Sequence, residues 1–183
     1  TQNAASSSVR RPLTPSASAG AEIEAAVRTI LVALGEDPER EGLRDTPGRV
    51  SRMYLEIFGG LFDNPSRHFE KQFRLDSDAG IVVIKDIQFY SMCEHHLLPF
   101  FGKAHVAYVP ADERVAGLSK FARVVETLSR RPQMQERLTG MIADTMTAML
   151  KPKGVLVLLE AEHMCMAMRG IRSGRAVTRT LVT

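Results

Sequence analysis

The sequence predicts an α+β domain in which helices cover one face of an antiparallel sheet. Runs of β-branched residues favour strands in the middle and at the end of the chain, and apolar residues at helical spacing favour helices. Strands both precede and follow a pair of helices, which is typical of this class. The 183 residues, 44% hydrophobic and 25% charged, match one globular domain in size and composition.

The first 20 residues are expected to be a tail outside this domain. Residues 1–20 are rich in Ser, Ala, Thr and Pro without a hydrophobic period, so burial cannot offset the entropy of ordering them. We therefore expect a disordered tail at 1–20 and the folded domain over 21–183. The tail lacks the apolar core of a secretory signal, and no stretch of the chain could span a bilayer. A cytoplasmic protein without membrane contact is expected.

The charge and cysteine content narrow the function classes. The formal net charge is +3, and Lys and Arg are interspersed with Asp and Glu, so nucleic acid is not an expected partner. A small anionic substrate is compatible with this balance. The two cysteines, Cys93 and Cys165, indicate metal binding, catalysis or free thiols in a reducing compartment rather than a disulfide.

Two helices are expected at the start of the domain. The first runs from Ala21 along an apolar stripe until Gly35 offers a C-terminal stop. In the second, Thr46 is the expected N-cap, Pro47 fits the first turn, and the stripe ends at residues 59–60. Both are expected to be packing elements.

The sheet is expected from four later segments. Residues 81–84 form a β-branched run, and residues 104–108 alternate before Pro110 ends them, so these two are expected to pair antiparallel. Residues 155–159 predict a buried strand, and 176–182 the last one. Between the two pairs, Ser119 is the expected cap of a helix to Ser129, and Pro132 is expected to start a second helix with its stripe reaching Met149.

The first chemical constellation lies between the predicted strands, where Cys93, Glu94, His95 and His96 are adjacent. Cys93 and His96 stand three residues apart, so a turn can direct both at one ion. Thiolate and imidazole together are a ligand pair that suits zinc. Two ligands are too few for a site.

The second constellation, residues 163–169, continues a predicted strand, so its side chains should alternate between two faces. His163, Cys165 and Arg169 would share the working face, and Met164, Met166 and Met168 would pack into the core. On that face Cys165 could bind an ion while His163 reaches a substrate, and Arg169 could hold an anionic group.

Together, Cys93, His96 and Cys165 would supply three protein ligands and leave one position of a zinc ion open, which is typical of catalytic sites. Such an ion lowers the pKa of a bound water to roughly 7. His95 and His163 could then move protons near neutral pH. From spacing alone, two buried thiols that never meet are the alternative. His68, in a polar segment, is interpreted as solvated.

A third group of candidate functional residues lies at the start of the helix for which Ser119 is the expected cap. Gly117, Ser119, Lys120 and Arg123 bring backbone amides, a hydroxyl and two cations to one helix N-terminus, where phosphates bind. The order of a P-loop is absent. Polar residues 133–137 open the next helix and are, by themselves, interpreted as first-turn capping.

Five motifs, in the same order along the chain, resemble the GTP cyclohydrolase I family: T-P-G-R-V at 46–50, C-E-H-H-L-L-P-F at 93–100, G-L-S-K at 117–120, R-P-Q-M-Q-E-R-L-T at 131–139 and H-M-C-M-A-M-R-G at 163–170. The resemblance runs from about residue 21 to the end of the chain. It implies the tunnelling fold (T-fold) and a toroidal homo-oligomer, typically a decamer, with active sites at subunit boundaries.

The resemblance also implies a reaction. Zinc on Cys93, His96 and Cys165 would support water addition at C8 of the guanine of GTP, with His163 protonating the imidazole ring at N7 and His95 assisting proton transfer. Ring opening, formate release and closure would give 7,8-dihydroneopterin triphosphate for pterin, folate or deazapurine biosynthesis. Further residues would bind the substrate: Gln135 and Glu136 the guanine, Lys120, Arg123 and Arg169 the triphosphate, Ser119 the sugar, and Arg49 a neighbouring subunit's site.

Two other hypotheses stay open on the sequence. The same fold could support a related reaction that stops at a formamide or cyclic-phosphate product. Alternatively, the chain could be a non-catalytic, zinc-stabilised subunit that binds GTP without releasing formate.

Overall fold

The computed structural model describes residues 13–76 and 80–183. Its main sheet has the strand order β5-β2-β3-β6-β7. The bounds are β2 (Val82–Cys93), β3 (Pro99–Val109), β5 (Pro132–Gln133), β6 (Gly154–His163) and β7 (Val177–Val182). β2 and β5 pair in parallel and the other neighbours antiparallel. The expected antiparallel pairing of 81–84 with 104–108 is confirmed, in strands that extend well beyond both runs.

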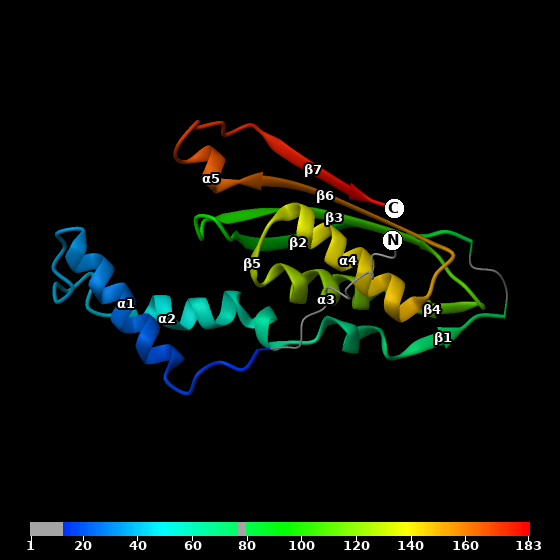
Figure 1. Cartoon of the computed structure of the whole chain (residues 1–183), viewed down its shortest axis with the longest axis horizontal. Helices are drawn as coiled ribbons and strands as arrows, with labels where there is room; N and C mark the ends of the chain where they lie inside the picture. Colours follow the sequence, from blue (N-terminus) through cyan, green and yellow to red (C-terminus); the bar gives the residue numbers. More distant parts are fainter. Residues whose placement is uncertain (1–12, 77–79) are drawn as a thin grey trace, which may run out of the picture.

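Helices α3 (Leu118–Ser129) and α4 (Gln135–Leu150) cover one face of this sheet (Figure 1). Alternate strand side chains point toward them and are buried, including Phe100, Ala104 and Val106 of β3. From the helices, Leu128 and Leu138 are fully buried against that face. Each fully buried Val, Leu or Phe side chain stabilises the fold by roughly 1.5–3 kcal/mol. The predicted α+β class, with helices on one face, is confirmed.

A small second sheet closes the far end of the domain. It joins β1 (Gln72–Arg74) to β4 (Arg114–Ala116), and two short 3-10 helices, η1 (Gly59–Phe62) and η2 (Pro65–Phe69), precede it. The backbone N–H of Ala116 donates to the Tyr108 hydroxyl at 3.3 Å. This bond ties the small sheet to the end of β3.

The N-terminal helices form an arm that projects from the sheet and its helices (Figure 1). α1 (Ala19–Ala33) and α2 (Thr46–Ile57) pack on each other, and Gly35, at φ +84°, follows α1 as the expected stop. Among the described residues, no side chain of α1 is buried, and Ile30 and Leu34 are 58% and 75% exposed. One chain alone therefore leaves part of the apolar stripe of α1 uncovered.

Four predicted helix starts are wrong by one to three residues, and the first of them, α1, begins at Ala19 instead of Ala21. Asp45, not Thr46, is the N-cap of α2, and Gly117, not Ser119, is the N-cap of α3. Pro132 does not start a helix, because it pairs with Met92 in β5 and α4 begins at Gln135. A proline is tolerated there because β5 is a short edge strand.

The predicted strand through Arg169 is also wrong. β6 ends at His163, and α5 (Met164–Ala167) follows at once. The neighbouring strand explains this end: His163 pairs with Phe100, and the next residue of β3 is Pro99, which has no N–H to offer and begins the strand. The two-face sorting of 163–169 therefore fails, and Met168 is 63% exposed rather than in the core.

Most of the expected tail at 1–20 lies outside the described residues, and its last two positions belong to α1. In the described part of the chain, no helix combines the length and apolar character needed to cross a membrane.

Candidate metal centre and active site

Cys93, His96 and Cys165 converge at one end of the sheet, with their ligand atoms all within 4.8 Å of one another. Cys93 is the last residue of β2, His96 lies in the turn that follows, and Cys165 lies on α5. The turn is fixed by Leu97 N–H donating to Cys93 O at 2.8 Å and by Cys93 N–H donating to Leu98 O at 2.9 Å. The alternative of two thiols that never meet is therefore wrong.

The donor set fits a soft or borderline divalent metal. Two thiols and an imidazole are ligands that zinc accepts, and three of them leave a fourth tetrahedral position for water or substrate. Burial raises the pKa of the Cys165 thiol, the adjacent Cys93 raises it further, and Arg169 counteracts this. A metal ion would displace the thiol protons, because thiolate is the binding form.

His163 lies beside this group at the end of β6, half-buried between two neighbours. Its Nε2 is 2.8 Å from Gln135 Oε1, and its ring stacks on Phe100 at a centroid distance of 4.7 Å and an interplanar angle of 2°. Burial lowers the pKa of His163 from its ordinary value, and Glu136 opposes this shift. The sequence reasoning missed the role of Phe100, although the motif at 93–100 contains it.

His95 and Arg169 are exposed at the edge of the same group. His95 Nδ1 is 4.0 Å from Cys93 Sγ, and Arg169 Nη1 is 3.0 Å from His96 Nε2. A guanidinium only donates, so Nε2 of His96 accepts this bond. Arg169 and a metal ion would therefore compete for Nε2, while Nδ1 is the other ligand atom of that ring.

An ion pair that the sequence reasoning missed holds in place the turn that carries Cys93 and His96. Arg137 of α4 binds both carboxylate oxygens of Glu94, at 2.5 and 2.9 Å. Glu94 N–H also donates to Gln133 O at 3.0 Å. The turn between Cys93 and His96 is thereby tied to the start of α4. The signal available in the sequence was an unassigned carboxylate, Glu94, between the candidate ligands Cys93 and His96.

The two residues expected to bind guanine differ in accessibility. Glu136 is exposed in the first turn of α4, where it acts electrostatically on His163. Gln135 is 2% exposed, and both ends of its amide already have partners within the chain. Only Glu136 is free to meet a ligand in this geometry.

The other predicted substrate residues are not brought to the metal group within one chain. The first half of α3 carries Ser119, Lys120 and Arg123. In the same part of the helix, the ring of Phe121 packs on that of Tyr108, with the two ring centroids 5.3 Å apart. Tyr108 is eight residues along β3 from Phe100, a span of roughly 26 Å at the rise of a strand. Arg49 lies on the arm and pairs with Asp45 at 3.2 Å.

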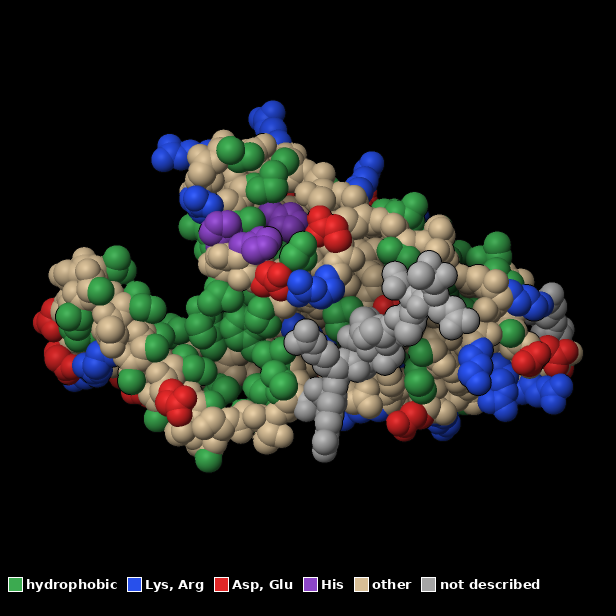
Figure 2. Space-filling view, viewed as in Figure 1, with side chains coloured by type: hydrophobic (Ala, Val, Ile, Leu, Met, Phe, Trp, Pro, Cys, Tyr) green, Lys and Arg blue, Asp and Glu red, His purple; other side chains and the backbone are tan. Residues whose placement is uncertain are grey.

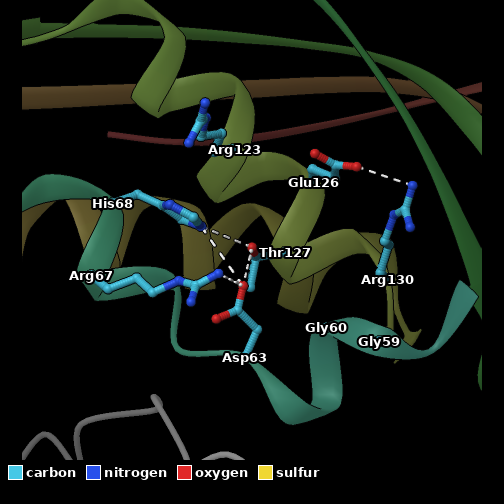
Figure 3. Close-up of a pocket in the computed structure, with 9 residues that line it drawn as sticks. All are labelled: Gly59, Gly60, Asp63, Arg67, His68, Arg123, Glu126, Thr127 and Arg130. Atoms are coloured by element: carbon cyan, nitrogen blue, oxygen red, sulfur yellow. Dashed lines mark hydrogen bonds and ion pairs between the residues drawn. The ribbon is translucent and has the colours of Figure 1, made fainter. Parts of the chain in front are cut away.

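Arg123 contributes instead to a pocket of about 480 Å³ between α3 and the η1–η2 segment (Figure 3). Its lining is rich in charge: Gly59, Gly60, Asp63, Arg67, His68, Arg123, Glu126, Thr127 and Arg130. The His68 side chain is only 10% exposed and lies 3.1 Å from Thr127 Oγ1, so the interpretation of His68 as solvated is wrong. Burial lowers the pKa of His68, and Asp63 opposes this shift.

Fold and site together define an α+β protein with a Cys-His-Cys group able to hold a metal ion and with a half-buried histidine beside it, which fits the class of enzymes that carry out hydrolysis at a metal site. A sequence model described as GTP cyclohydrolase I matches residues 23–183. The chain therefore belongs to the GTP cyclohydrolase I family, and the resemblance and the enzyme class expected from the motifs are confirmed.

Curated relatives named GTP cyclohydrolase 1 agree with this assignment. The protein from Carboxydothermus hydrogenoformans is 60% identical over 159 residues, which cover 87% of this chain and 82% of the relative. Those from Geobacillus kaustophilus and Bacillus subtilis are 58% and 57% identical, over 87% of this chain and 85% and 83% of theirs. A crystal structure of the archaeosine synthase QueF-Like in the apo form aligns at 15% identity and a TM-score of 0.44, covering 58% of this chain and 94% of that one. That likeness is too weak to bear on function.

Proposed function

We propose that this chain opens the imidazole ring of GTP at C8 by hydrolysis, with zinc as its metal, and yields formate and 7,8-dihydroneopterin triphosphate for pterin, folate or deazapurine biosynthesis. The observation that carries the proposal is the convergence of Cys93, His96 and Cys165 beside His163 in a chain of this family. When bound there, zinc supplies hydroxide near neutral pH by lowering the pKa of a coordinated water.

The chain's own residues do the remaining work. His163, held by Phe100 and Gln135, delivers a proton to the guanine imidazole ring while water adds at C8, and His95 exchanges protons at the solvent side. One water opens the ring, a second releases formate, and closure onto the rearranged ribose returns one water. Glu136 accepts from guanine N–H groups, which disfavours adenine because the ring nitrogen of adenine on that edge carries no hydrogen to donate to the carboxylate.

A complete site on this proposal takes residues from more than one subunit. The triphosphate is held by Lys120, Arg123 and Arg169, and the sugar is held by Ser119. Three of these residues lie on α3, which is far from the metal group of the same chain. Arg49 on the arm completes the site of a neighbouring subunit. We therefore propose a homo-oligomer, a toroidal decamer, with active sites between subunits.

Uncovered apolar surface supports this assembly. Figure 2 shows hydrophobic side chains gathered in the recess between the arm and the rest of the molecule, next to a cluster of histidine side chains. An apolar groove of about 600 Å³ lies at the foot of the arm, lined by residues that include Ile57, Tyr90, Met92 and Pro99. A second subunit seated there would remove this surface from water. The free thiols of the metal group fit a reducing compartment, so we place the enzyme in the cytoplasm.

The proposal is tested by incubating the zinc-quantified protein with GTP, oxidising the mixture, and measuring neopterin fluorescence together with formate. Both products in equal amounts are expected. A formamide or a cyclic phosphate without neopterin would show a different outcome on the same fold. Bound GTP with no formate would favour the non-catalytic subunit.

A further inference from the structure

The side-chain amide of Gln135 is buried and hydrogen-bonded through both its nitrogen and its oxygen. It belongs to the first residue of α4 and is 2% exposed. Its Nε2 lies 3.2 Å from Leu159 O, 3.0 Å from Thr178 O and 3.2 Å from Thr180 Oγ1, all on β6 and β7. Two of these partners are carbonyl oxygens, which only accept. The amide nitrogen therefore faces the strands, and the amide oxygen faces the other way.

A chain of hydroxyls supports the same orientation. Thr139 Oγ1 donates to Gln135 O at 2.8 Å and lies 2.6 Å from Thr180 Oγ1. Because the hydrogen of Thr139 is used on Gln135 O, Thr180 donates to Thr139, and a lone pair of Thr180 Oγ1 shares one of the two Nε2 hydrogens of Gln135 with a strand carbonyl. Every donor then has an acceptor, whereas a flipped amide would place its oxygen against two carbonyl oxygens.

The orientation of the Gln135 amide determines which ring nitrogen of His163 carries a hydrogen. Gln135 Oε1 lies 2.8 Å from His163 Nε2, and an amide oxygen can only accept. Nε2 of His163 must therefore carry a hydrogen, and in the neutral ring Nδ1 holds the lone pair. The parallel stacking on Phe100, at 4.7 Å, fixes the plane of the ring.

We infer that Gln135 is a positioning residue: it holds His163 in the Nε2–H tautomer, so that Nδ1 is the nitrogen that exchanges a proton with the substrate. This revises the expectation that Gln135 contacts guanine, and it rests on the proposed function for the identity of the substrate. The proton given to the base leaves Nδ1, and the hydrogen on Nε2 stays bonded to Gln135 throughout. Supporting groups of this kind fix the tautomer of functional histidines elsewhere.

The first test reads the tautomer directly, without turnover. Solid-state nitrogen-15 NMR of histidine-labelled, full-length protein at about pH 8.5, where histidine is neutral, distinguishes the two tautomers, and His163→Asn identifies the signal among the five histidines. We expect His163 to be Nε2–H in the wild type and a mixture of tautomers in Gln135→Leu. An Nδ1–H ring in the wild type would overturn the inference, even if Gln135→Leu failed to fold.

The second test separates positioning from substrate contact. Gln135→Leu should lower kcat for GTP by roughly 10- to 100-fold and leave KM within about twofold. A matched control is Gln72→Leu, since Gln72 Nε2 also bridges two backbone carbonyls, at 3.2 and 2.9 Å, but makes no hydrogen bond to a histidine among the described residues. The Gln72→Leu variant should keep the wild-type kcat and the wild-type tautomer of His163. A raised KM with an unchanged tautomer in Gln135→Leu would make Gln135 a substrate contact. A wild type that does not turn over GTP would refute the proposed function, while the NMR result would still decide this inference.

Discussion

The candidate metal ligands and their neighbours differ in how easily they can be identified from the sequence. Cys93, His96 and Cys165 could be predicted because few residue types bind zinc and two of them lie three positions apart. Phe100 and Gln135 could not be assigned to His163 in this way, because stacking and amide orientation depend on the register of β3 with β6 and on how α4 packs. Residues that act through another side chain carry no chemical signature of their own.

His68 provides a prediction about pH. Its folded-state pKa lies below the ordinary 6.5 because of burial, so the unfolded chain binds the proton more readily. Its contribution to stability is complete above 6.5 and is lost as the pH falls below that value. Wild type should therefore lose more free energy of unfolding between about pH 7.5 and 5.5 than His68→Gln, which has no such titration.

Denaturant unfolding at fixed protein concentration across that range measures this difference. The exposed surface change Arg74→Gln serves as a control that leaves the pH slope unaltered, because Arg74 is 79% exposed in its ion pair. Parallel slopes for wild type and His68→Gln would contradict the assignment of His68 as a buried neutral group.

At the scale of elements, the turn between β2 and β3 depends on the start of α4. Arg137 is half exposed in its pair with Glu94, so Arg137→Leu should cost only about 0–1 kcal/mol of stability. The turn carries two metal ligands, however, so zinc affinity should fall by roughly 10-fold or more. Arg137→Lys should restore it only in part, because lysine lacks the planar fork that binds both oxygens.

Competition with a zinc chelator measures the affinity, and denaturant unfolding the stability. Arg74→Leu, which breaks another Arg–Glu pair at the far end of the domain, is the matched control. If zinc affinity stayed at the wild-type value in Arg137→Leu, the pair would have no part in holding the turn.

The two adjacent glycines of η1, Gly59 and Gly60, differ in how closely other atoms pack around them. A Cβ on Gly60 would lie 2.0 Å from Thr127 O and 2.8 Å from Arg130 O, whereas one on Gly59 would meet nothing within 4 Å. Gly60→Ala should therefore destabilise the domain by about 1–3 kcal/mol, and Gly59→Ala by less than about 0.5 kcal/mol. Comparison of the denaturation midpoints of the two variants tests this prediction. Equal midpoints would contradict it, because they would mean that α3 can move away from η1 at little cost.

Element types were easier to predict than element ends. The stripes and β-branched runs predicted helices α1 to α4 and strands β2, β3, β6 and β7, but not the short elements β1, β4, β5 and α5. The boundary at His163 depends on Pro99 in the neighbouring strand, 64 positions away in sequence. Similarly, Pro132 looks like a helix start until its pairing with Met92 is seen. Local signals cannot report such long-range pairing.

For the whole molecule, the arm provides the prediction about assembly. Ile30 is 58% exposed on α1, and on our proposal a neighbouring subunit covers it. Ile30→Asp should give a smaller particle by size-exclusion chromatography with light scattering, and turnover of GTP should fall by roughly 100-fold or more because cations from other subunits are lost. Ile81→Asp, at a site 68% exposed and away from the arm, is the control. A monomeric Ile30→Asp with full turnover would refute sites shared between subunits.

The most direct test of the central claim is to remove the metal from the protein, add zinc back in steps, and measure formate release from GTP against the zinc bound. We expect turnover to rise in proportion to occupancy and to level off at about one zinc per chain, with Cys165→Ser neither binding zinc tightly nor releasing formate. Full turnover in the metal-free protein, or in Cys165→Ser without bound metal, would contradict the account.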